Sequence, residues 1–319
     1  MKVAVIGTGY VGLVTGTVLA DFGNQVIGVD KDAAKIKQLQ AGQIPIYEPG
    51  LTELVQKNTL QKRLTFTTNL DQAVTDSELI FIAVGTPPKA SGEADTSAVK
   101  AVLTTIGKTL LTIIKNDPNC YKVIVNKSTV PIGMGAKATQ LLKDLGIDKR
   151  NFGIVSNPEF LREGSAVSDS LRPNRVVLGS NSDKALDLIQ KLYRPLYLIE
   201  TPFVRTNLET AELIKYASNC FLATKISFIN EMATLCDLVG ANVRAVSKAM
   251  GLDNRIGRYF LHAGPGYGGS CFPKDTKALI AIAKKYGYDL ELVKAAEAIN
   301  TSQKHRVGEI VARYFQNQN

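Results

Sequence analysis

The chain has 319 residues, of which 45% are apolar, 21% charged and 7% aromatic. This balance excludes intrinsic disorder, and the length predicts two domains. The content of 26 Gly and 12 Pro excludes collagen-like and proline-rich classes, and no apolar run approaches the roughly 20 residues that cross a membrane. The net charge of +9 is scattered, as on an ordinary solvated surface or on one that attracts small anions such as nucleotides, and no basic run interleaved with aromatic residues indicates nucleic acid.

The four cysteines and two histidines form no CxxC pair and no zinc-type spacing. We therefore expect no metal site, no disulfide framework and a cytoplasmic location.

Up to about residue 200, short β-branched runs alternate with helical patterns, which is typical of βαβ units. This predicts an α/β fold class, a doubly wound parallel sheet in a Rossmann-like NAD-binding domain. The expected strands are residues 2–6, 25–29, 79–84, 122–126, 152–155, 175–178 and 196–199, and the expected helices are residues 11–22, 32–41, 97–115, 135–145 and 183–193.

After Thr201 the strand signal stops, which predicts an all-helical central domain. We place the domains at residues 1–203 and 204–319. A long spine helix is expected over residues 207–239. It has two apolar stripes on nearly opposite faces, and a helix of this kind is buried between two packed layers, which favours a homodimer. One stripe holds Ile214, Ala217, Phe221 and Phe228, and the other holds Leu222, Ile226, Ile229 and Ala233.

A GxGxxG turn directly follows the first expected strand and opens a helix. Its glycines, Gly7, Gly9 and Gly12, would allow a tight turn, the approach of a pyrophosphate and close helix packing. Asp30 ends the second strand, where a carboxylate would bind ribose hydroxyls and repel a 2′-phosphate, so NAD is favoured over NADP. Lys31 beside it weakens that repulsion. The alternative is a fold that keeps the turn without the ligand.

A cysteine, Cys271, stands where a glycine-rich loop becomes a helix. Helix-start amides and Lys274 would favour its thiolate, which makes it a candidate nucleophile. Asp275 lies one turn later on the same helix face. We interpret the remaining cysteines, Cys120, Cys220 and Cys236, as small buried apolar residues.

Lys215 and Asn219, four residues apart, share one face of the long helix. They could form a cation and amide pair that stabilises an oxyanion, or they could be a snorkelling lysine and a solvated amide; the spacing leaves both open.

Five motifs follow one another along the chain: residues 7–12 (GTGYVG), 85–88 (GTPP), 127–131 (KSTVP), 157–164 (NPEFLREG) and 268–275 (GGSCFPKD). With these motifs in this order, the chain resembles the UDP-glucose 6-dehydrogenase family. GDP-mannose 6-dehydrogenases usually have Leu after the cysteine, where this chain has Phe272, and UDP-N-acetylhexosamine dehydrogenases typically lose the Ser-Cys-Phe pattern.

The resemblance implies oxidation of C6 of UDP-glucose with two NAD⁺ through a cysteine thiohemiacetal and thioester. Catalytic roles would then fall on Cys271, Lys215, Asn219, Asp275, Thr129 and Glu159. Cofactor contacts would come from Gly7, Gly9, Tyr10, Val11, Gly12, Asp30, Lys31, Thr86, Thr129 and Glu163. Substrate contacts would come from Phe160, Leu161, Arg162, Lys215, Asn219, Phe260, Leu261 and Gly268, with Arg255 reaching the site of a neighbouring subunit.

Members of this family usually carry a C-terminal UDP-binding domain, and this chain ends at Asn319, where that domain would begin. We expect NAD binding to be retained, while substrate affinity and turnover are open. Two alternatives therefore stand beside UDP-glucose oxidation. One is a GDP-mannose or other nucleotide-sugar 6-dehydrogenase, and the other is a catalytically silent NAD-binding and dimerisation fragment.

Overall fold

A computed structural model describes residues 1–316. The Cα atoms group into two compact units. The first contains residues 1–86 and 95–215, and the second contains residues 87–94 and 216–319.

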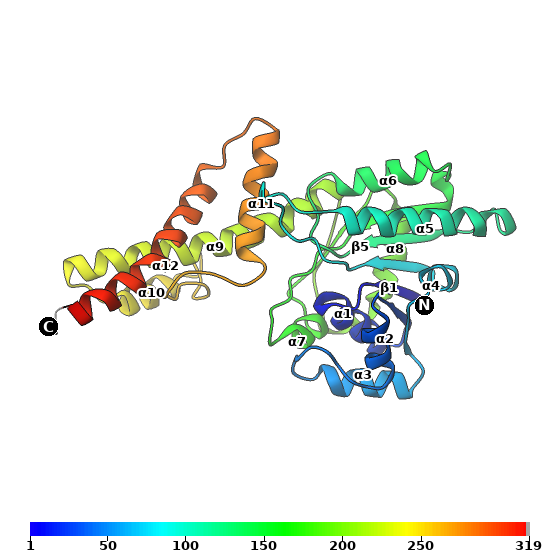
Figure 1. Cartoon of the computed structure of the whole chain (residues 1–319), viewed down its shortest axis with the longest axis horizontal. Helices are drawn as coiled ribbons and strands as arrows, with labels where there is room; N and C mark the ends of the chain where they lie inside the picture. Colours follow the sequence, from blue (N-terminus) through cyan, green and yellow to red (C-terminus); the bar gives the residue numbers. More distant parts are fainter. Residues whose placement is uncertain (317–319) are drawn as a thin grey trace. The chain divides into compact units, whose positions relative to one another are not determined.

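The first unit, in which Figure 1 labels β1 and β5, is built on an eight-stranded sheet in the order β3-β2-β1-β4-β5-β6-β7-β8. The order reverses at β1, and such a switch point is where open α/β sheets bind ligands. Neighbouring strands pair in parallel except β6 and β7, which meet in one antiparallel pair, Ser156 with Gly179. The strands are β1 Lys2–Ile6, β2 Gln25–Val29, β3 Leu64–Thr67, β4 Leu79–Ile82, β5 Lys122–Asn126, β6 Phe152–Ser156, β7 Val176–Gly179 and β8 Phe203–Thr206.

Helices cover both faces of this sheet because alternate strand residues point to opposite sides. Val3 and Val5 belong to one core cluster, and Ala4 and Ile6 to the other. The first cluster includes side chains of α1 Tyr10–Asp21, α2 Ala33–Gln40, α3 Leu51–Leu60, α7 Ala166–Leu171 and α8 Asp183–Leu192. The second includes side chains of α4 Leu70–Asp76, α5 Ser97–Asn116 and α6 Met134–Asp144. The predicted fold class is therefore confirmed.

Of the described helices, α5 has the length and apolar composition that a membrane span would need. Its Val99, Leu103, Ile106 and Leu110 are fully buried in the second core cluster. This burial is typical of a core helix in an α/β domain.

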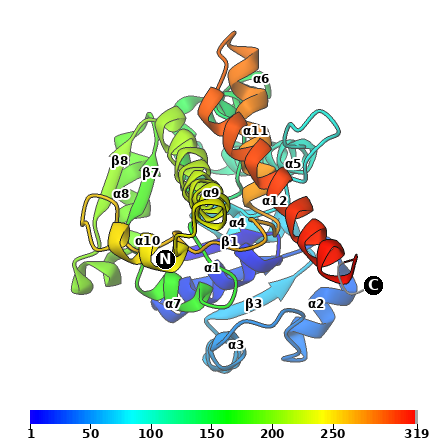
Figure 2. The same cartoon turned by 90° about the vertical axis from the view of Figure 1, so that its left-hand side faces the viewer.

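The prediction of a strand at residues 196–199 is wrong. These residues belong to the 3₁₀ helix η2, Arg194–Ile199, with Pro195 in its first turn. Leu196 is buried while Leu198 is exposed, whereas residues i and i+2 of a strand would share one face, so this burial fits a helical turn. The strand is instead β8, which pairs with β7 and lies beside it (Figure 2). The strand signal thus extends beyond Thr201.

The second unit is helical, as predicted. Its elements are the part of α9, Leu208–Val239, from residue 216 onward, together with α10 Val243–Gly251, α11 Phe272–Lys285 and α12 Glu291–Gln316. The spine helix is thus present as α9. On its surface Phe221 is 64% exposed and Phe228 is 42% exposed, whereas Ile229 is buried. The first of the two predicted stripes is therefore open to solvent in this chain.

Candidate active site

The glycine turn joins β1 to α1 at the carboxyl edge of the sheet. Gly7 has φ +97°, which L-residues rarely adopt, and its N–H donates to the Val29 carbonyl at 2.7 Å. A Cβ on Gly12 would lie 1.8 Å from the Gly7 oxygen, whereas a Cβ on Gly9 would have nothing within 4 Å. Gly12 is thus required by packing, and the space beside Gly9 is open to a ligand.

The helices that follow the parallel strands begin at this same edge. Side-chain acceptors bind the first amides of α2 (Asp32), α4 (Asn69), α5 (Asp95), α6 (Glu212) and α7 (Glu48). By contrast, α1 begins at Gly9, which has no side-chain cap. Because free helix-start amides bind anions, α1 is the helix suited to a cofactor pyrophosphate, and the open space at Gly9 fits it.

Asp30 lies at the end of β2 and accepts hydrogen bonds from Thr8 N, Thr8 Oγ1 and Lys35 Nζ at 2.9–3.0 Å. Burial would raise the pKa of Asp30, but these bonds outweigh it and lower the pKa to about 2. A carboxylate that stays ionised suits a ribose diol. The neighbouring cation that pairs with Asp30 is Lys35; Lys31 is exposed.

A buried carboxylate joins α1 to the segment that follows β6. Glu48 accepts from Tyr10 Oη at 2.5 Å, from Gly164 N at 2.9 Å and from Ala166 N at 2.7 Å. Burial, together with the Glu48 bond, raises the pKa of Tyr10. The sequence analysis missed Glu48, because its partners lie 38 to 118 residues away.

Thr86 and Thr129 lie together after β4 and β5. The Thr86 hydroxyl donates to the Thr129 carbonyl at 2.8 Å, and the Ser128 hydroxyl donates to the Val84 carbonyl at 2.7 Å. A hydrogen bond thus joins the two segments that carry these predicted cofactor contacts.

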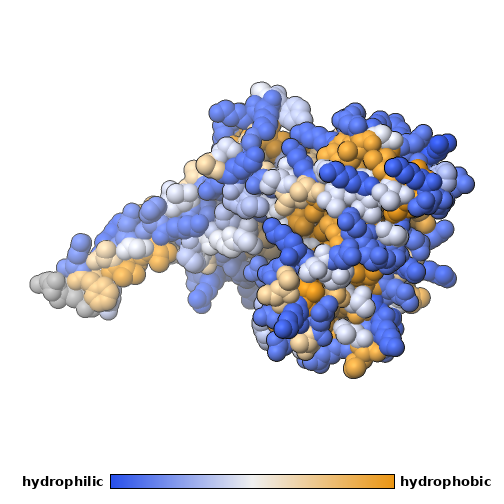
Figure 3. Space-filling view, turned by 45° about the vertical axis from the view of Figure 1, so that its right-hand side comes forward, coloured by the Kyte–Doolittle hydropathy of each residue, from blue (hydrophilic) through white to orange (hydrophobic). Residues whose placement is uncertain are grey.

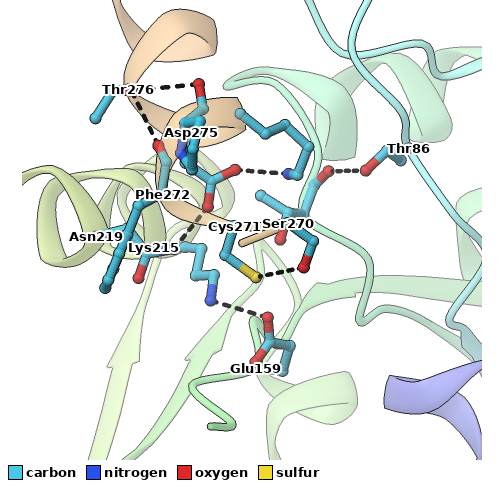
Figure 4. Close-up of polar contacts among 12 residues, drawn as sticks. Thr86, Glu159, Lys215, Asn219, Ser270, Cys271, Phe272, Asp275 and Thr276 are labelled. Carbon is cyan, nitrogen blue, oxygen red and sulfur yellow. Dashed lines mark hydrogen bonds and ion pairs between the residues drawn. The ribbon is translucent and has the colours of Figure 1, made fainter. Parts of the chain in front are cut away.

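Lys215 and Glu159 form an ion pair of 2.9 Å, drawn in Figure 4, with side chains 5% and 8% exposed. Glu159 also accepts from Leu161 N at 2.6 Å. Nearby, the Arg175 guanidinium stacks 3.6 Å from the centre of the Phe160 ring. Lys215 is therefore buried and is not a snorkelling lysine, and its ammonium faces a carboxylate that lies 56 residues away in the sequence.

A second lysine, Lys127, donates to Asn157 Oδ1 at 3.1 Å in the same region. Burial lowers the pKa of Lys127 to about 8, and the positive charge of Lys215 acts in the same direction. Lys127 is the first residue of the KSTVP motif, and the sequence alone indicates no role for it.

In the second unit, Cys271 is exposed and is the N-cap residue of α11, with its sulfur 3.6 Å from Ser270 Oγ. Asp275, one turn later, is buried and accepts from Asn219 Nδ2 and from Lys274 Nζ, each at 2.6 Å (Figure 4). The structure thus pairs Asn219 with Asp275. It also shows Lys274 bound to that carboxylate.

The glycine-rich loop before Cys271 is held by amide side chains. Asn300 exchanges two hydrogen bonds with the Tyr267 backbone, at 2.7 and 3.1 Å. Asn230 accepts from Gly264 N, and Gln303 donates to the Gly264 carbonyl, each at 2.8 Å. These residues lack a local sequence signal, because each acts on a loop 33 to 39 residues away.

The other predicted substrate residues are spread over both units. Phe260 has φ +64°, an uncommon backbone conformation for an aromatic residue, and Leu261 is buried. Arg162 binds Asp169 at 2.5 Å, and Arg255 binds Asp253 at 2.6 Å. Gly268 and Glu163 are exposed and Val11 is half-buried.

The remaining cysteines differ from Cys271. Cys220 and Cys236 are buried, Cys120 is half-buried, and burial raises the pKa of Cys220 to about 12. Across residues 1–316, no group of three or more His, Cys, Asp or Glu side chains could hold a metal ion.

Comparison with protein families gives two adjacent matches. Residues 1–197 match the NAD binding domain of the UDP-glucose/GDP-mannose dehydrogenase family, and residues 209–302 match the central domain of that family.

Two curated relatives are similar over most of this chain. The Bacillus subtilis UDP-glucose 6-dehydrogenase TuaD is 54% identical over 96% of this chain and 64% of its own length. The Rhizobium meliloti UDP-glucose 6-dehydrogenase is 49% identical over 97% of this chain and 69% of its own length. The chain thus spans about two thirds of the length of these relatives.

Two solved structures of dehydrogenases that act on nucleotide sugars are similar to this chain. A UDP-glucose dehydrogenase from Pyrobaculum islandicum has a TM-score of 0.88 at 38% identity, covering 94% of this chain and 68% of that one. A GDP-mannose dehydrogenase from Pseudomonas aeruginosa has a TM-score of 0.76 at 34% identity, and the match covers 98% of this chain and 71% of the Pseudomonas chain.

Proposed function

From the premise that this chain belongs to the UDP-glucose/GDP-mannose dehydrogenase family, we propose that it oxidises C6 of UDP-glucose to give UDP-glucuronate. Family membership confirms the resemblance drawn from the five motifs, and NAD is the cofactor. The net reaction consumes UDP-glucose, two NAD⁺ and water.

Each proposed residue has a defined task. Bound NAD supplies the hydride acceptor for both oxidations. The Cys271 thiolate adds to the C6 aldehyde to form a thiohemiacetal, and further oxidation leaves a thioester that water cleaves, freeing the thiol and the acid. Lys215 and Asn219 stabilise the oxyanions, Asp275 with Thr129 and a water accepts protons, and Glu159 assists thioester hydrolysis.

The observation that carries this proposal is the exposure of Cys271 at the N-cap of α11. A thiol must be accessible to capture an aldehyde. Cys220 and Cys236, which are buried, lack that access.

The ligand-binding assignments are part of the same proposal. NAD would be held by Gly7, Gly9, Tyr10, Val11, Gly12, Asp30, Lys31, Thr86, Thr129 and Glu163. UDP-glucose would be held by Phe160, Leu161, Arg162, Lys215, Asn219, Phe260, Leu261 and Gly268, with Arg255 supplied by a second subunit.

The stoichiometry of NADH formation tests the reaction. We expect two NADH per UDP-glucose, whereas a ratio of one would indicate a simple alcohol dehydrogenase. Cys271→Ser should abolish formation of the acid, and Cys236→Ser, at a buried thiol, should change stability alone. Equal losses in the two variants would contradict the assignment of Cys271.

Two alternatives have their own support. The likeness to a GDP-mannose dehydrogenase supports GDP-mannose as the substrate, while Phe272 after the cysteine favours UDP-glucose. Parallel assays with the two sugar nucleotides decide between these substrates. The match of residues 1–197 to an NAD binding domain is equally the support for a catalytically silent NAD-binding and dimerisation module. Calorimetry showing heat from NAD but none from either sugar nucleotide, with no turnover, would favour that module.

Three further assignments complete the proposal. The two functional domains are residues 1–203 and 204–319, and the protein acts in the cytoplasm. A homodimer would form through α9, because Phe221 and Phe228 expose one of its apolar stripes. Further apolar surface lies on α12, where Val307, Ile310, Val311 and Tyr314 are exposed, and Figure 3 shows hydrophobic residues on the surface of the helical unit.

A further inference from the structure

Glu212 is a buried carboxylate that the proposed chemistry does not use. It lies in the second turn of α9, is 2% exposed, and is bound to the start of α6. Its Oε2 accepts from Gly133 N at 2.6 Å and its Oε1 from Gly135 N at 2.7 Å. One side chain therefore satisfies two amides that lie 77 and 79 residues away.

The local sequence of α6 cannot provide this acceptor. Its N-cap is Gly133, with φ +87° and no side chain, so the first amides need a partner from elsewhere. Two bonds to a carboxylate at a helix N-terminus are charge-assisted and favoured by the helix dipole. Glu212 is thus the cap of α6, delivered by α9.

The two helices also pack closely around this carboxylate. A Cβ on Gly135 would lie 2.8 Å from Leu208 Cδ2, and Leu208 shares the second core cluster with Val130 and Met134. The first turn of α6 is therefore held against the first turn of α9 by packing as well as by charge.

This contact joins two segments to which the proposed reaction gives roles. Lys215 follows Glu212 by three residues on α9 and binds Glu159 at 2.9 Å. Thr129 precedes Gly133 by four residues, and its carbonyl accepts a hydrogen bond from the Thr86 hydroxyl. Thr129 and Lys215 are therefore connected through a few residues, because each lies within four residues of the hydrogen bond between Gly133 and Glu212.

We propose that Glu212 is a positioning residue, which fixes the Thr129 segment with respect to Lys215 by binding the first amides of α6. This inference rests on the proposed function, because it assigns Glu212 to the geometry of the same reaction. The groups that would hold the pyrophosphate and ribose are the start of α1 and Asp30, whereas Glu212 binds the start of α6. Thr129 is assigned both to the cofactor and to the reaction, so Glu212 should affect turnover much more than NAD affinity.

The principal variant is Glu212→Gln, which keeps the size but replaces one acceptor oxygen with an NH₂ that faces an N–H. The matched control is Glu209→Gln, which removes a charge from the preceding turn of the same helix. We also use Glu212→Asp, which keeps the charge but withdraws the carboxylate by one methylene, in case the glutamine variant does not fold. Assays at about pH 8.5 keep Glu212 ionised, since burial raises its pKa to about 7.

We expect Glu212→Gln to lower kcat by about 10-fold or more, because misplacing catalytic groups by about 1 Å is costly. KM for UDP-glucose and Kd for NAD by calorimetry should each change by less than about threefold. Glu212→Asp should lower kcat by at least about threefold, and Glu209→Gln should behave as wild type. An unchanged kcat in Glu212→Asp would overturn the proposal. So would a rise in the Kd for NAD by the same factor as the loss of kcat.

Amide hydrogen exchange separates this inference from the proposed function. Peptides covering residues 127–137 should exchange about 10-fold faster in the Glu212 variants, with peptides of β1 and β4 unchanged. If the wild-type protein oxidises no UDP-glucose, the proposed function fails and exchange alone decides about Glu212. In that case, faster amide exchange in residues 127–137 of the Glu212 variants supports the positioning role of Glu212, and exchange at the wild-type rate in these residues rules it out.

Discussion

Substituting alanine separately at Gly9 and Gly12 tests how the glycine turn binds NAD. The two positions differ in space: an added Cβ meets nothing within 4 Å at Gly9, but lies 1.8 Å from the Gly7 oxygen at Gly12. At Gly9 the backbone φ of −72° suits alanine. We therefore expect Gly9→Ala to fold normally and Gly12→Ala to be strained.

The magnitudes follow from these contacts. In Gly9→Ala, a methyl group beside the pyrophosphate would remove one charge-assisted amide bond, which costs about 1.5–3 kcal/mol or about 10- to 150-fold in Kd. Its free energy of unfolding should change by less than about 0.5 kcal/mol. In Gly12→Ala, overpacking against a backbone oxygen should cost about 1–3 kcal/mol or more, lowering Tm by about 2–12 °C.

The assay is calorimetric titration with NAD, beside thermal unfolding of each apoprotein. Wild-type NAD affinity in Gly9→Ala would refute the assignment of α1 as the pyrophosphate site. The same drop in Tm for both variants would refute the distinction between open and packed glycines.

Three further predictions concern the buried charges and the exposed stripe. Lys215→Ala should lower kcat far more than it raises KM, and should destabilise the fold by about 3–5 kcal/mol by leaving Glu159 buried without its cation; an effect on KM alone would make Lys215 a binding residue. Because the pKa of Glu212 is about 7 in the folded protein and lower when unfolded, stability should fall by up to about 3 kcal/mol from about pH 4.5 to 7 and then level off; denaturant titrations should show no such decline in Glu212→Gln. Light scattering should give a dimer for the wild type and a monomer for Phe228→Glu, and a wild-type mass of 34.5 kDa would remove the dimer from the proposal.

Strong local patterns made much of the fold predictable. Residues 2–6, 25–29 and 122–126 were placed correctly as strands, because β-branched runs between turn residues are local signals. The strand Leu64–Thr67 was missed although its Leu and Phe are buried and alternate with Thr; four residues give little statistical weight. The segment 196–199 was misassigned because a short apolar run fits a strand or a helical turn.

The candidate site was predictable where motifs are contiguous and was hidden where partners are distant. Cys271 and the glycine turn follow from adjacent residues. The ion pair of Lys215 with Glu159 joins residues 56 apart, and the caps from Glu48 and Glu212 cross 77 to 118 residues. Such contacts depend on the order of strands in the sheet, which no local spacing encodes.

Glu48 binds the first amide of α7, so that helix start already holds a negative charge supplied by the protein. In the proposed binding mode, a diphosphate at this edge of the sheet would therefore be attracted to the start of α1 and repelled from the start of α7. A cofactor bound as proposed would thus have one favoured orientation rather than two.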